Sequence, residues 1–505
     1  MAEKKDQYEA VIGLEIHIRL KTQSKMYCGS GNKDSEIPNE HICPICMGHP
    51  GTLPQLNDEA VRLGTMLALA LSCEITKETK FDRKNYFYPD LPKGYQISQY
   101  DMPIATNGYY ELYADDMEPK RIRIERLHLE EDAAKSRHDT EGQTLIDFNR
   151  AGAPLVELVT QPDIRSAGEA KAFVQELQQV ARYIGASHAD MEKGHLRCDA
   201  NISLRPIGDT ALYPKTEIKN MNSFRSIERA LEYEIERQTA LWEDHKAPEQ
   251  ITTRGWDDKR GITVEQRTKE EAADYRYFPE PDLPPLHRSD EEIRSLLAKL
   301  PELPYVRRIR FKDEYALSYH DAKLLTEDPA VGEFFERTMS ELRAWLYSLE
   351  DEPGSDDEIW KKYRSKLGRM TFSWLTSELF GLLKKAGEDF SSVPFTAENF
   401  AELLTLVFEK RINSSAGQHI LKIMYDEGGD PSLIMQDHQL EQMGDANEID
   451  AAVEGVINKN PEVVAEYKSG KEKVLMFLVG QVMKATKGKV NPEIATELLE
   501  KKLKK

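Results

Sequence analysis

The stretch V-I-G-L-E-I-H-I-R-L, residues 11–20, decides how the first part of the chain folds. Apolar and polar side chains alternate along it with a period of two residues, which predicts a β-strand that places successive side chains on opposite faces of a sheet. The apolar face comprises Leu14, Ile16, Ile18 and Leu20. The opposite face carries Glu15, His17 and Arg19, and such a face is either solvated or holds a ligand.

Four further segments place charged residues on one face of a predicted strand: residues 126–132, 152–159, 195–205 and 213–220. A sheet that turns one face to water explains each segment alone. Together, however, the segments repeat Glu, His, Arg and Asp, whereas an ordinary solvent face favours Thr, Lys, Ser and Gln. Glu157 stands within an apolar run, where a carboxylate is costly unless it is paired or ligated.

Carboxylates and an imidazole on adjacent strands favour a site for Mg²⁺ and a nucleoside triphosphate. Mg²⁺ prefers hard oxygen ligands and shares its remaining positions with water and phosphates. Nearby Arg and Lys side chains would neutralise the charge that develops during phosphoryl transfer. The chain has no G-x-x-x-x-G-K-[ST] motif. Phosphoryl chemistry would therefore use an acidic sheet instead of a P-loop.

Length and composition favour a multidomain cytoplasmic protein. The chain has 505 residues, of which 40% are hydrophobic and 31% charged, and this size predicts two to four domains. It contains no apolar run of the ~18 residues that a membrane span needs, and its N-terminus lacks the apolar core of a signal peptide. Five cysteines without an export signal favour a reducing compartment.

The net charge of −20 argues against a nucleic-acid partner, but the charge is unevenly distributed. From Lys468 to the C-terminus, ten lysines stand against four glutamates. This local surplus of six positive charges fits either a solvated lysine tail or a surface that binds RNA.

The pattern of residues predicts an α+β domain with a mixed or antiparallel sheet, followed by two all-helical domains. Strand patterns dominate residues 1–290, and helical periodicity follows from residue 291. The proline-rich stretch 279–286 precedes this change, and residues 391–400 contain a second helix start. We therefore expect a catalytic domain at 1–290, a helical domain at 291–395 and a helical tail domain at 396–505.

Three cysteines form a metal-like pattern. Cys43 and Cys46 make a C-x-x-C, and Cys28 lies upstream of them. Three thiolates are one fewer than a closed structural zinc site needs. His41 or His49 would be available as the fourth ligand. The alternatives are a zinc knuckle and a structural cysteine pair without metal.

Six blocks of sequence, together with the opening strand, resemble the B-subunit family of bacterial tRNA-dependent amidotransferases that act on Glu-tRNA(Gln) and Asp-tRNA(Asn). The blocks lie in the same order as in the family and span nearly the whole chain, at residues 80–99, 126–136, 196–206, 217–224, 274–283 and 477–488. Members that carry zinc have C-x-C before the C-x-x-C, whereas this chain has Ser30 at the second position.

The resemblance implies a glutamine-synthetase-like cradle, a helical domain and a YqeY-like tail that binds tRNA. It implies ATP-dependent amidation of mischarged tRNA through an acyl phosphate. The implied Mg²⁺ ligands are Glu15, His17, Glu130 and Glu157, and Lys84 and Glu131 correspond to the polar gate for ammonia. The implied contacts with ATP or substrate are Asp199, Asn201, Arg205, Glu217, Lys219 and Asn222.

The resemblance also implies partners, because the chain has no Ser-Ser-Lys amidase signature. An amidase A subunit would hydrolyse glutamine, and a small C subunit would complete a heterotrimeric carbon–nitrogen ligase of protein biosynthesis. Two rival hypotheses are a free-standing carboxylate–amine ligase with a small-molecule substrate and a non-catalytic tRNA-binding scaffold. Binding of tRNA by the tail tests the first rival, and glutamine substitutions at Glu15 and Glu157 test the second.

Overall fold

The computed structural model describes residues 7–113, 119–138, 142–268, 275–349, 353–441, 446–469, 471–486, 489–490 and 492–503. The chain divides into two compact units, residues 1–306 and 307–505. The first unit is built around strands and the second is helical, so the predicted α+β class with helical domains is confirmed.

The described strands all belong to the first unit. They are β1 (Tyr8–Arg19), β2 (Glu74–Ile75), β3 (Glu78–Thr79), β4 (Asp82–Asn85), β5 (Tyr95–Ser98), β6 (Ala105–Leu112), β7 (Lys120–Glu131), β8 (Lys135–His138), β9 (Thr144–Asp147), β10 (Pro154–Thr160), β11 (Leu196–Pro206), β12 (Thr216–Met221), β13 (Thr252–Asp257), β14 (Ile262–Thr268), β15 (Phe278–Pro279) and β16 (Leu286–His287).

A nine-stranded sheet with the order β14-β13-β12-β11-β1-β10-β7-β6-β2 forms the centre of this unit. Its strand pairs are antiparallel except for β12 and β13, which are parallel. The opening stretch of the sequence is β1, which lies between β11 and β10. The five polar-faced segments predicted from sequence are thus five consecutive strands, β12 to β7.

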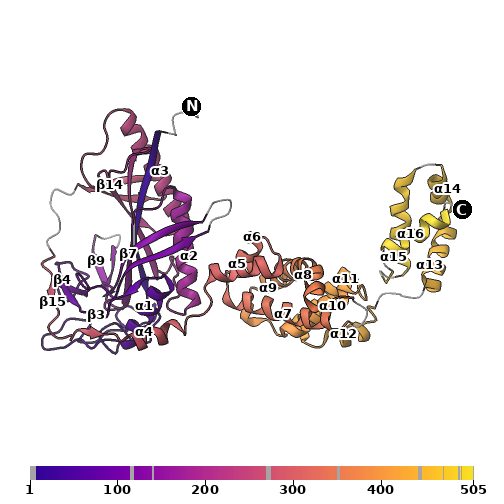
Figure 1. Ribbon diagram of the computed structural model, residues 1–505, viewed down its shortest axis with the longest axis horizontal. Coiled ribbons are helices and arrows are strands. Elements are labelled where there is room, and N and C mark those ends of the chain that lie inside the picture. The colour runs from indigo at the N-terminus through magenta and orange to yellow at the C-terminus, as the bar shows by residue number, and fades with distance from the viewer. Residues whose placement is uncertain are drawn as a thin grey trace. The chain divides into compact units, whose positions relative to one another are not determined.

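Helices cover the apolar face of the sheet. They are α1 (Asp58–Ala70), α2 (Ala167–Tyr183), α3 (Phe224–Glu243) and α4 (Asp290–Leu297), and Figure 1 shows α2 along one side of the sheet. Ile12, Leu14, Ile16 and Ile18 of β1 are at most 1% exposed and share one hydrophobic core with these helices. The period-two pattern of the sequence therefore buries one face of β1 and leaves the other for polar side chains.

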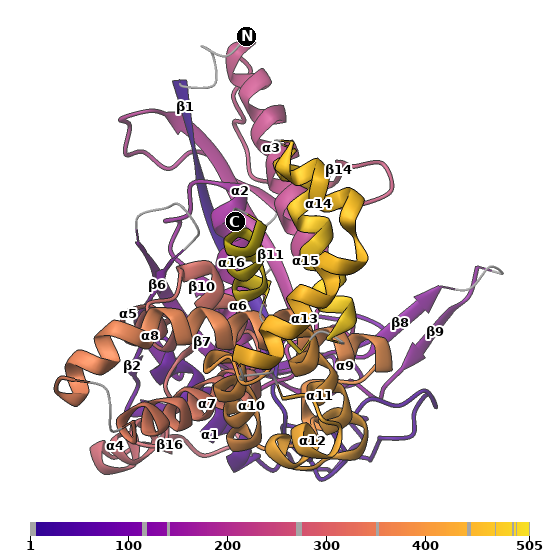
Figure 2. The ribbon, with the colours of Figure 1, turned by 90° about the vertical axis from the view of Figure 1, so that its right-hand side faces the viewer.

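Smaller sheets extend the polar side. β15, β4 and β5 form a three-stranded sheet, and β16 pairs with β3. Side chains of β5 bond to β7; for example, the Ser98 hydroxyl donates to a Glu130 carboxylate oxygen at 3.3 Å. β8 and β9 form a hairpin that projects from the unit (Figure 2). These contacts bring β4 and β5 next to the polar face of the large sheet.

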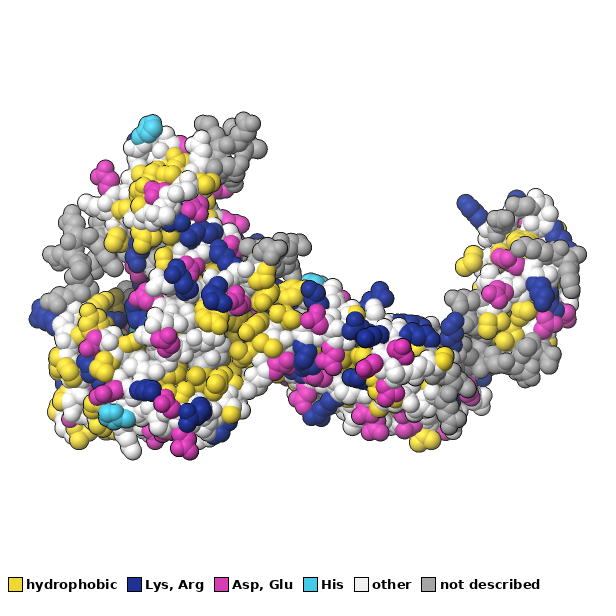
Figure 3. Space-filling view, viewed as in Figure 1, with side chains coloured by type: hydrophobic (Ala, Val, Ile, Leu, Met, Phe, Trp, Pro, Cys, Tyr) yellow, Lys and Arg dark blue, Asp and Glu magenta, His cyan; other side chains and the backbone are white. Residues whose placement is uncertain are grey.

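The second unit contains two hydrophobic clusters, one from Phe311 to Met435 and one from Ile449 to Leu503. Its helices are α5 (Pro304–Tyr315, which begins in the first unit), α6 (Tyr319–Leu325), α7 (Pro329–Tyr347), α8 (Asp356–Ser373), α9 (Phe380–Ala386), α10 (Ala397–Phe408), α11 (Ser414–Glu427), α12 (Pro431–Asp437), α13 (Ala446–Lys459), α14 (Pro461–Lys468), α15 (Leu475–Ala485) and α16 (Pro492–Leu503). Figure 3 shows cationic and acidic side chains interspersed on the visible face of this unit.

The helix start predicted in residues 391–400 is confirmed. Thr396 caps α10, because its side chain accepts a hydrogen bond from the Asn399 amide in a capping box. The predicted domain boundaries at 290/291 and 395/396 stay predictions; the second lies within the sequence range of the first hydrophobic cluster. Within the described residues, each helix is too short or too polar to cross a membrane.

Candidate functional site

An acidic cluster forms where β1, β10 and β7 lie side by side. His17 of β1 stands opposite Glu157 of β10, and Glu157 stands opposite His128 of β7. Residues that are directly opposite in a sheet point to the same face. Glu15 and Glu130 lie two residues along from His17 and His128, so they share this face. Register alone therefore gathers five polar side chains, here called the acidic cluster.

The side chains of the acidic cluster contact one another. His128 Nε2 lies 3.0 Å from Glu157 Oε2, and His17 Nε2 lies 3.5 Å from both Glu157 Oε2 and Glu130 Oε1. Glu130 is 2% exposed and Glu157 is 6% exposed. Buried carboxylates of this kind need cations or ligated ions beside them. The high cost inferred for Glu157 from sequence is met here by two imidazoles.

These contacts shift the pKa values of the cluster. Burial opposes protonation of His128, but the Glu157 and Glu130 carboxylates outweigh it and raise the pKa of His128 to about 9. Burial also opposes protonation of His17, whose pKa is nevertheless raised by Glu157 and Glu130. Burial would raise the pKa of Glu157, yet the two imidazoles hold it below its ordinary value. Burial and the Glu157 charge raise the pKa of Glu15.

A lysine stands at each end of the acidic cluster. At one end, burial opposes the charge of Lys84 on β4, but Glu130 and the other nearby negative charges raise its pKa. At the other end, Lys219 Nζ on β12 lies 3.2 Å from Asp199 Oδ2 and 3.1 Å from Glu217 Oε1. The array thus runs across six strands, with positive charge at both ends and negative charge in the middle.

The acidic cluster has the donor set of a divalent cation site. Ligand atoms of Glu15, His17 and Glu157 lie within 4.8 Å of one another, and so do those of His128, Glu130 and Glu157. Carboxylate oxygens predominate, which suits Mg²⁺ better than softer metals. The residues present therefore fit the ion that the sequence implied.

Glu131 points away from the acidic cluster, because it follows Glu130 on the same strand. It forms an ion pair with Lys93, and one of its carboxylate oxygens accepts a hydrogen bond from the Ile97 amide at 2.9 Å. The resemblance assigned Lys84 to the same polar gate as Glu131, and that assignment stays a prediction. Lys84 lies over the ring of Tyr275, with its ammonium 4.9 Å from the ring centroid. The structure thus pairs Glu131 with Lys93.

A cavity of about 220 Å³ lies further along β1 from Glu15 and is lined by residues of β1, β7, β10 and β11. Among the residues that line it are Gly13 of β1 and Asn201 and Ser203 of β11. The other predicted contacts lie further out: Arg205 donates to Glu9 at 2.7 Å, and Asn222 is exposed. Glu217 accepts from the Thr253 hydroxyl at 3.0 Å.

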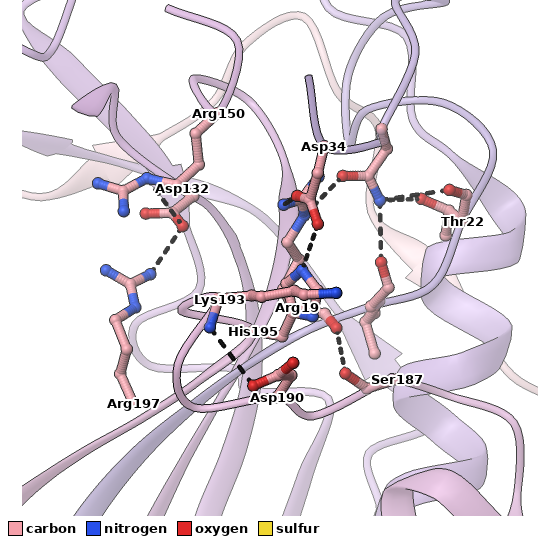
Figure 4. Close-up of polar contacts among 12 residues, drawn as sticks. Arg19, Thr22, Asp34, Asp132, Arg150, Ser187, Asp190, Lys193, His195 and Arg197 are labelled. Carbon is pink, nitrogen blue, oxygen red and sulfur yellow. Dashed lines mark hydrogen bonds and ion pairs between the residues drawn. The ribbon is translucent and has the colours of Figure 1, made fainter. Parts of the chain in front are cut away.

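Beyond His17, the charged side chains of the polar face are held by hydrogen bonds and ion pairs to one another (Figure 4). Arg19 donates to Asp34 at 2.8 Å, and His195 Nε2 lies 3.0 Å from the other oxygen of Asp34. Arg197, which stands opposite His17, donates to the buried Asp132 at 2.7 Å. Arg19 therefore has a structural partner in Asp34.

The three predicted cysteine ligands also converge. The ligand atoms of Cys28, Cys43 and Cys46 lie within 4.8 Å of one another. A hydrogen bond from Cys28 lowers the pKa of the Cys46 thiol to about 4 despite burial, and Lys25, whose Nζ lies 3.5 Å from Cys46 Sγ, acts in the same direction. Three convergent cysteine side chains of this kind would fit Zn²⁺ with one position left open. Cys73 and Cys198 are buried in the hydrophobic core of the first unit.

Two residues of the site, His128 and Lys93, were not among those predicted from the sequence. His128 carried a usable signal, since it shares a strand face with Glu130. Lys93 lies in a loop before β5, where no periodicity marks it.

Two family models match the chain: the GatB/GatE catalytic domain over residues 10–294 and the GatB domain over residues 357–503. Among similar curated proteins, one from Carboxydothermus hydrogenoformans is 44% identical over 99% of both chains. One from Thermoanaerobacter sp. (strain X514) is 43% identical over 99% of this chain and 100% of its own. Both are named as the B subunit of an aspartyl/glutamyl-tRNA(Asn/Gln) amidotransferase. The chain therefore belongs to the GatB family, the B subunits of the aspartyl/glutamyl-tRNA(Asn/Gln) amidotransferases.

Proposed function

We propose that the chain is the activating subunit of an ATP-dependent, tRNA-dependent amidotransferase. It converts mischarged Glu-tRNA(Gln), Asp-tRNA(Asn) or both into the cognate Gln-tRNA and Asn-tRNA used in translation. The observation that supports this most is the acidic cluster with a lysine at each end. Family membership supports the choice of tRNA as the carrier of the substrate.

Each part of the array has a role in activating a carboxylate. A free carboxylate is a poor electrophile, whereas an acyl phosphate carries a good leaving group. Lys84 would hold the side-chain carboxylate of the aminoacyl group, and Lys219 would bind phosphate oxygens of ATP. The cavity beside Gly13 and Asn201 would take the rest of the nucleotide.

Glu15, His17, Glu130 and Glu157 would hold Mg²⁺, which when bound neutralises charge on the phosphates. The four side chains are fixed by strand register, so they need little reorganisation during the reaction. His128 orients Glu157 through their 3.0 Å contact. Glu130 and Glu157 are buried, and a site with so little exposed surface would help to keep water from hydrolysing the acyl phosphate.

Ammonia completes the reaction, and we propose that it arrives past Glu131 and Lys93. The Glu131–Lys93 ion pair lines a small cavity beside the Cys46 loop, which would give ammonia a polar path toward Glu130. The ammonia would come from an amidase A subunit that hydrolyses glutamine, with a small C subunit in the same cytoplasmic heterotrimer. Cys28, Cys43 and Cys46 would bind a structural Zn²⁺.

The helical tail, with ten lysines against four glutamates from residue 468, would bind the tRNA. Its lysines are partly engaged: Lys502, for example, pairs with Asp450 and Glu454 at 2.7 and 2.6 Å. The exposed Lys473 and Lys484 are candidates for phosphate contacts.

The test is amidation of each mischarged tRNA by the complex of this chain with its partner subunits, supplied with ATP and glutamine. We expect amide formation that requires ATP and is lost in Glu15→Gln while glutamine hydrolysis continues. Full amidation by Glu15→Gln and Glu157→Gln would favour the scaffold alternative. Amidation of free glutamate would favour the small-molecule ligase.

A further inference from the structure

Four tyrosines from three segments of the chain form a continuous row of rings. Tyr86 and Tyr275 are 5.8 Å apart between ring centroids, and Tyr275 and Tyr277 are 6.0 Å apart. Tyr277 and Tyr100 are stacked, with centroids 4.3 Å apart and planes inclined by 11°. We call these four residues the tyrosine row. Tyr100, at one end of the row, is 61% exposed.

The tyrosine row leads to the acidic cluster. It contacts Lys84, whose ammonium lies over the Tyr275 ring. Burial raises the pKa of Tyr277 to about 12 against the effect of Lys84, and Glu130 and Glu157 are close enough to act in the same direction as burial. The row therefore connects the protein surface with the lysine that would hold the substrate carboxylate.

If the tyrosines served only to stabilise the fold, their rings would be expected to be buried, because an exposed aromatic ring contributes no burial free energy. Here the terminal ring is exposed and flat against its neighbour. An exposed aromatic face beside cationic groups is typical of surfaces that stack unpaired nucleobases. The aminoacyl group is esterified through its α-carboxyl to the terminal adenosine, so this base must lie close to Lys84 when the side-chain carboxylate does.

We propose that Tyr100, supported by Tyr277, stacks the 3′-terminal adenine of the aminoacyl-tRNA and thereby positions the aminoacyl carboxylate at Lys84. The inference rests on the proposed function and names the part of the substrate that this surface recognises. The adenine of ATP binds elsewhere, in the cavity beside Gly13 and Asn201. That cavity is lined by residues of β1, β7, β10 and β11, and none of the four tyrosines is among the residues that line it.

The test replaces the terminal adenine by 2-aminopurine, whose fluorescence is quenched when it stacks on an aromatic ring. The labelled tRNA is titrated with the complete complex containing wild type, Tyr100→Ala or Tyr100→Phe. We expect quenching with wild type and Tyr100→Phe and its loss with Tyr100→Ala. In parallel, the KM for aminoacyl-tRNA should rise about tenfold in Tyr100→Ala, with the KM for ATP unchanged.

Tyr88→Ala is the matched control, because Tyr88 is 58% exposed and lies outside the tyrosine row. Equal loss of quenching in Tyr88→Ala and Tyr100→Ala, or undiminished quenching in Tyr100→Ala, would overturn the inference. A rise in the KM for ATP in Tyr100→Ala would also overturn it, because the tyrosine row would then bind the nucleotide. Failure of the proposed function is read separately, as wild-type complex that forms no amide.

Discussion

Replacing Glu157 by glutamine tests the acidic cluster at its centre. The change keeps the shape of the side chain and one oxygen acceptor but removes a buried negative charge beside two imidazoles. Opposite unit charges about 4 Å apart contribute about 4 kcal/mol at an effective dielectric constant of about 20. Because glutamine retains an acceptor, we expect a loss of about 3 kcal/mol in transition-state stabilisation, or about a 100-fold fall in the rate of amidation.

The assay is single-turnover amidation of mischarged tRNA by the complete complex at several Mg²⁺ concentrations. Glu157→Gln should need more Mg²⁺ and should remain slow at saturation, while its glutamine hydrolysis continues. Glu176→Gln is the control, because Glu176 is also buried but bonds to Tyr110 at 2.8 Å, outside the cluster. A Glu157→Gln complex that works within twofold of wild type at the same Mg²⁺ concentration would refute the reasoning.

Two further predictions concern charges around the site, and a third concerns the three clustered cysteines. The pKa of His128 is raised to about 9, so its ion pair stabilises the metal-free protein fully below the unfolded pKa of about 6.5, and this stabilisation is lost as pH rises through about 9. Thermal unfolding in the presence of a chelator should show the unfolding temperature falling over this pH range. In Glu157→Gln the unfolding temperature should depend less on pH. Lys93→Met should lower amide yield per ATP cleaved by on the order of tenfold, whereas Lys84→Met should slow ATP cleavage itself, as product analysis would reveal. Cys46→Ser should abolish zinc content by atomic absorption and lower the unfolding temperature, and Ser30→Cys should raise zinc affinity by completing four thiolates; equal zinc content in wild type and Cys46→Ser would contradict the assignment.

The alternating pattern in residues 11–20 was enough to predict β1 and the direction of its side chains. The same reasoning predicted that Glu157 needs a partner, since an isolated carboxylate in an apolar strand is costly. It could not predict which strands are neighbours, because strand order depends on contacts distant in sequence. The convergence of Glu15, Glu130 and Glu157 follows only from the order β1-β10-β7.

Residues outside regular elements were the hardest to predict. Lys93 reaches Glu131 from a loop, and the tyrosine row brings together residues as far apart as Tyr86 and Tyr277. Neither has a local period or spacing, so the sequence alone offers no signal for either. The capping of α10 by Thr396, by contrast, is a local interaction and was readable directly.

Transfer of an oxygen isotope tests most directly whether this sheet face activates a carboxylate by phosphorylation. Mischarged tRNA carrying glutamate with ¹⁸O at both oxygens of its side-chain carboxylate is supplied to the complete complex with ATP and glutamine, and the inorganic phosphate is analysed by mass spectrometry. Our account predicts one ¹⁸O atom in the phosphate for each amide formed, and loss of both products in Glu15→Gln. Amide formed with unlabelled phosphate would contradict it.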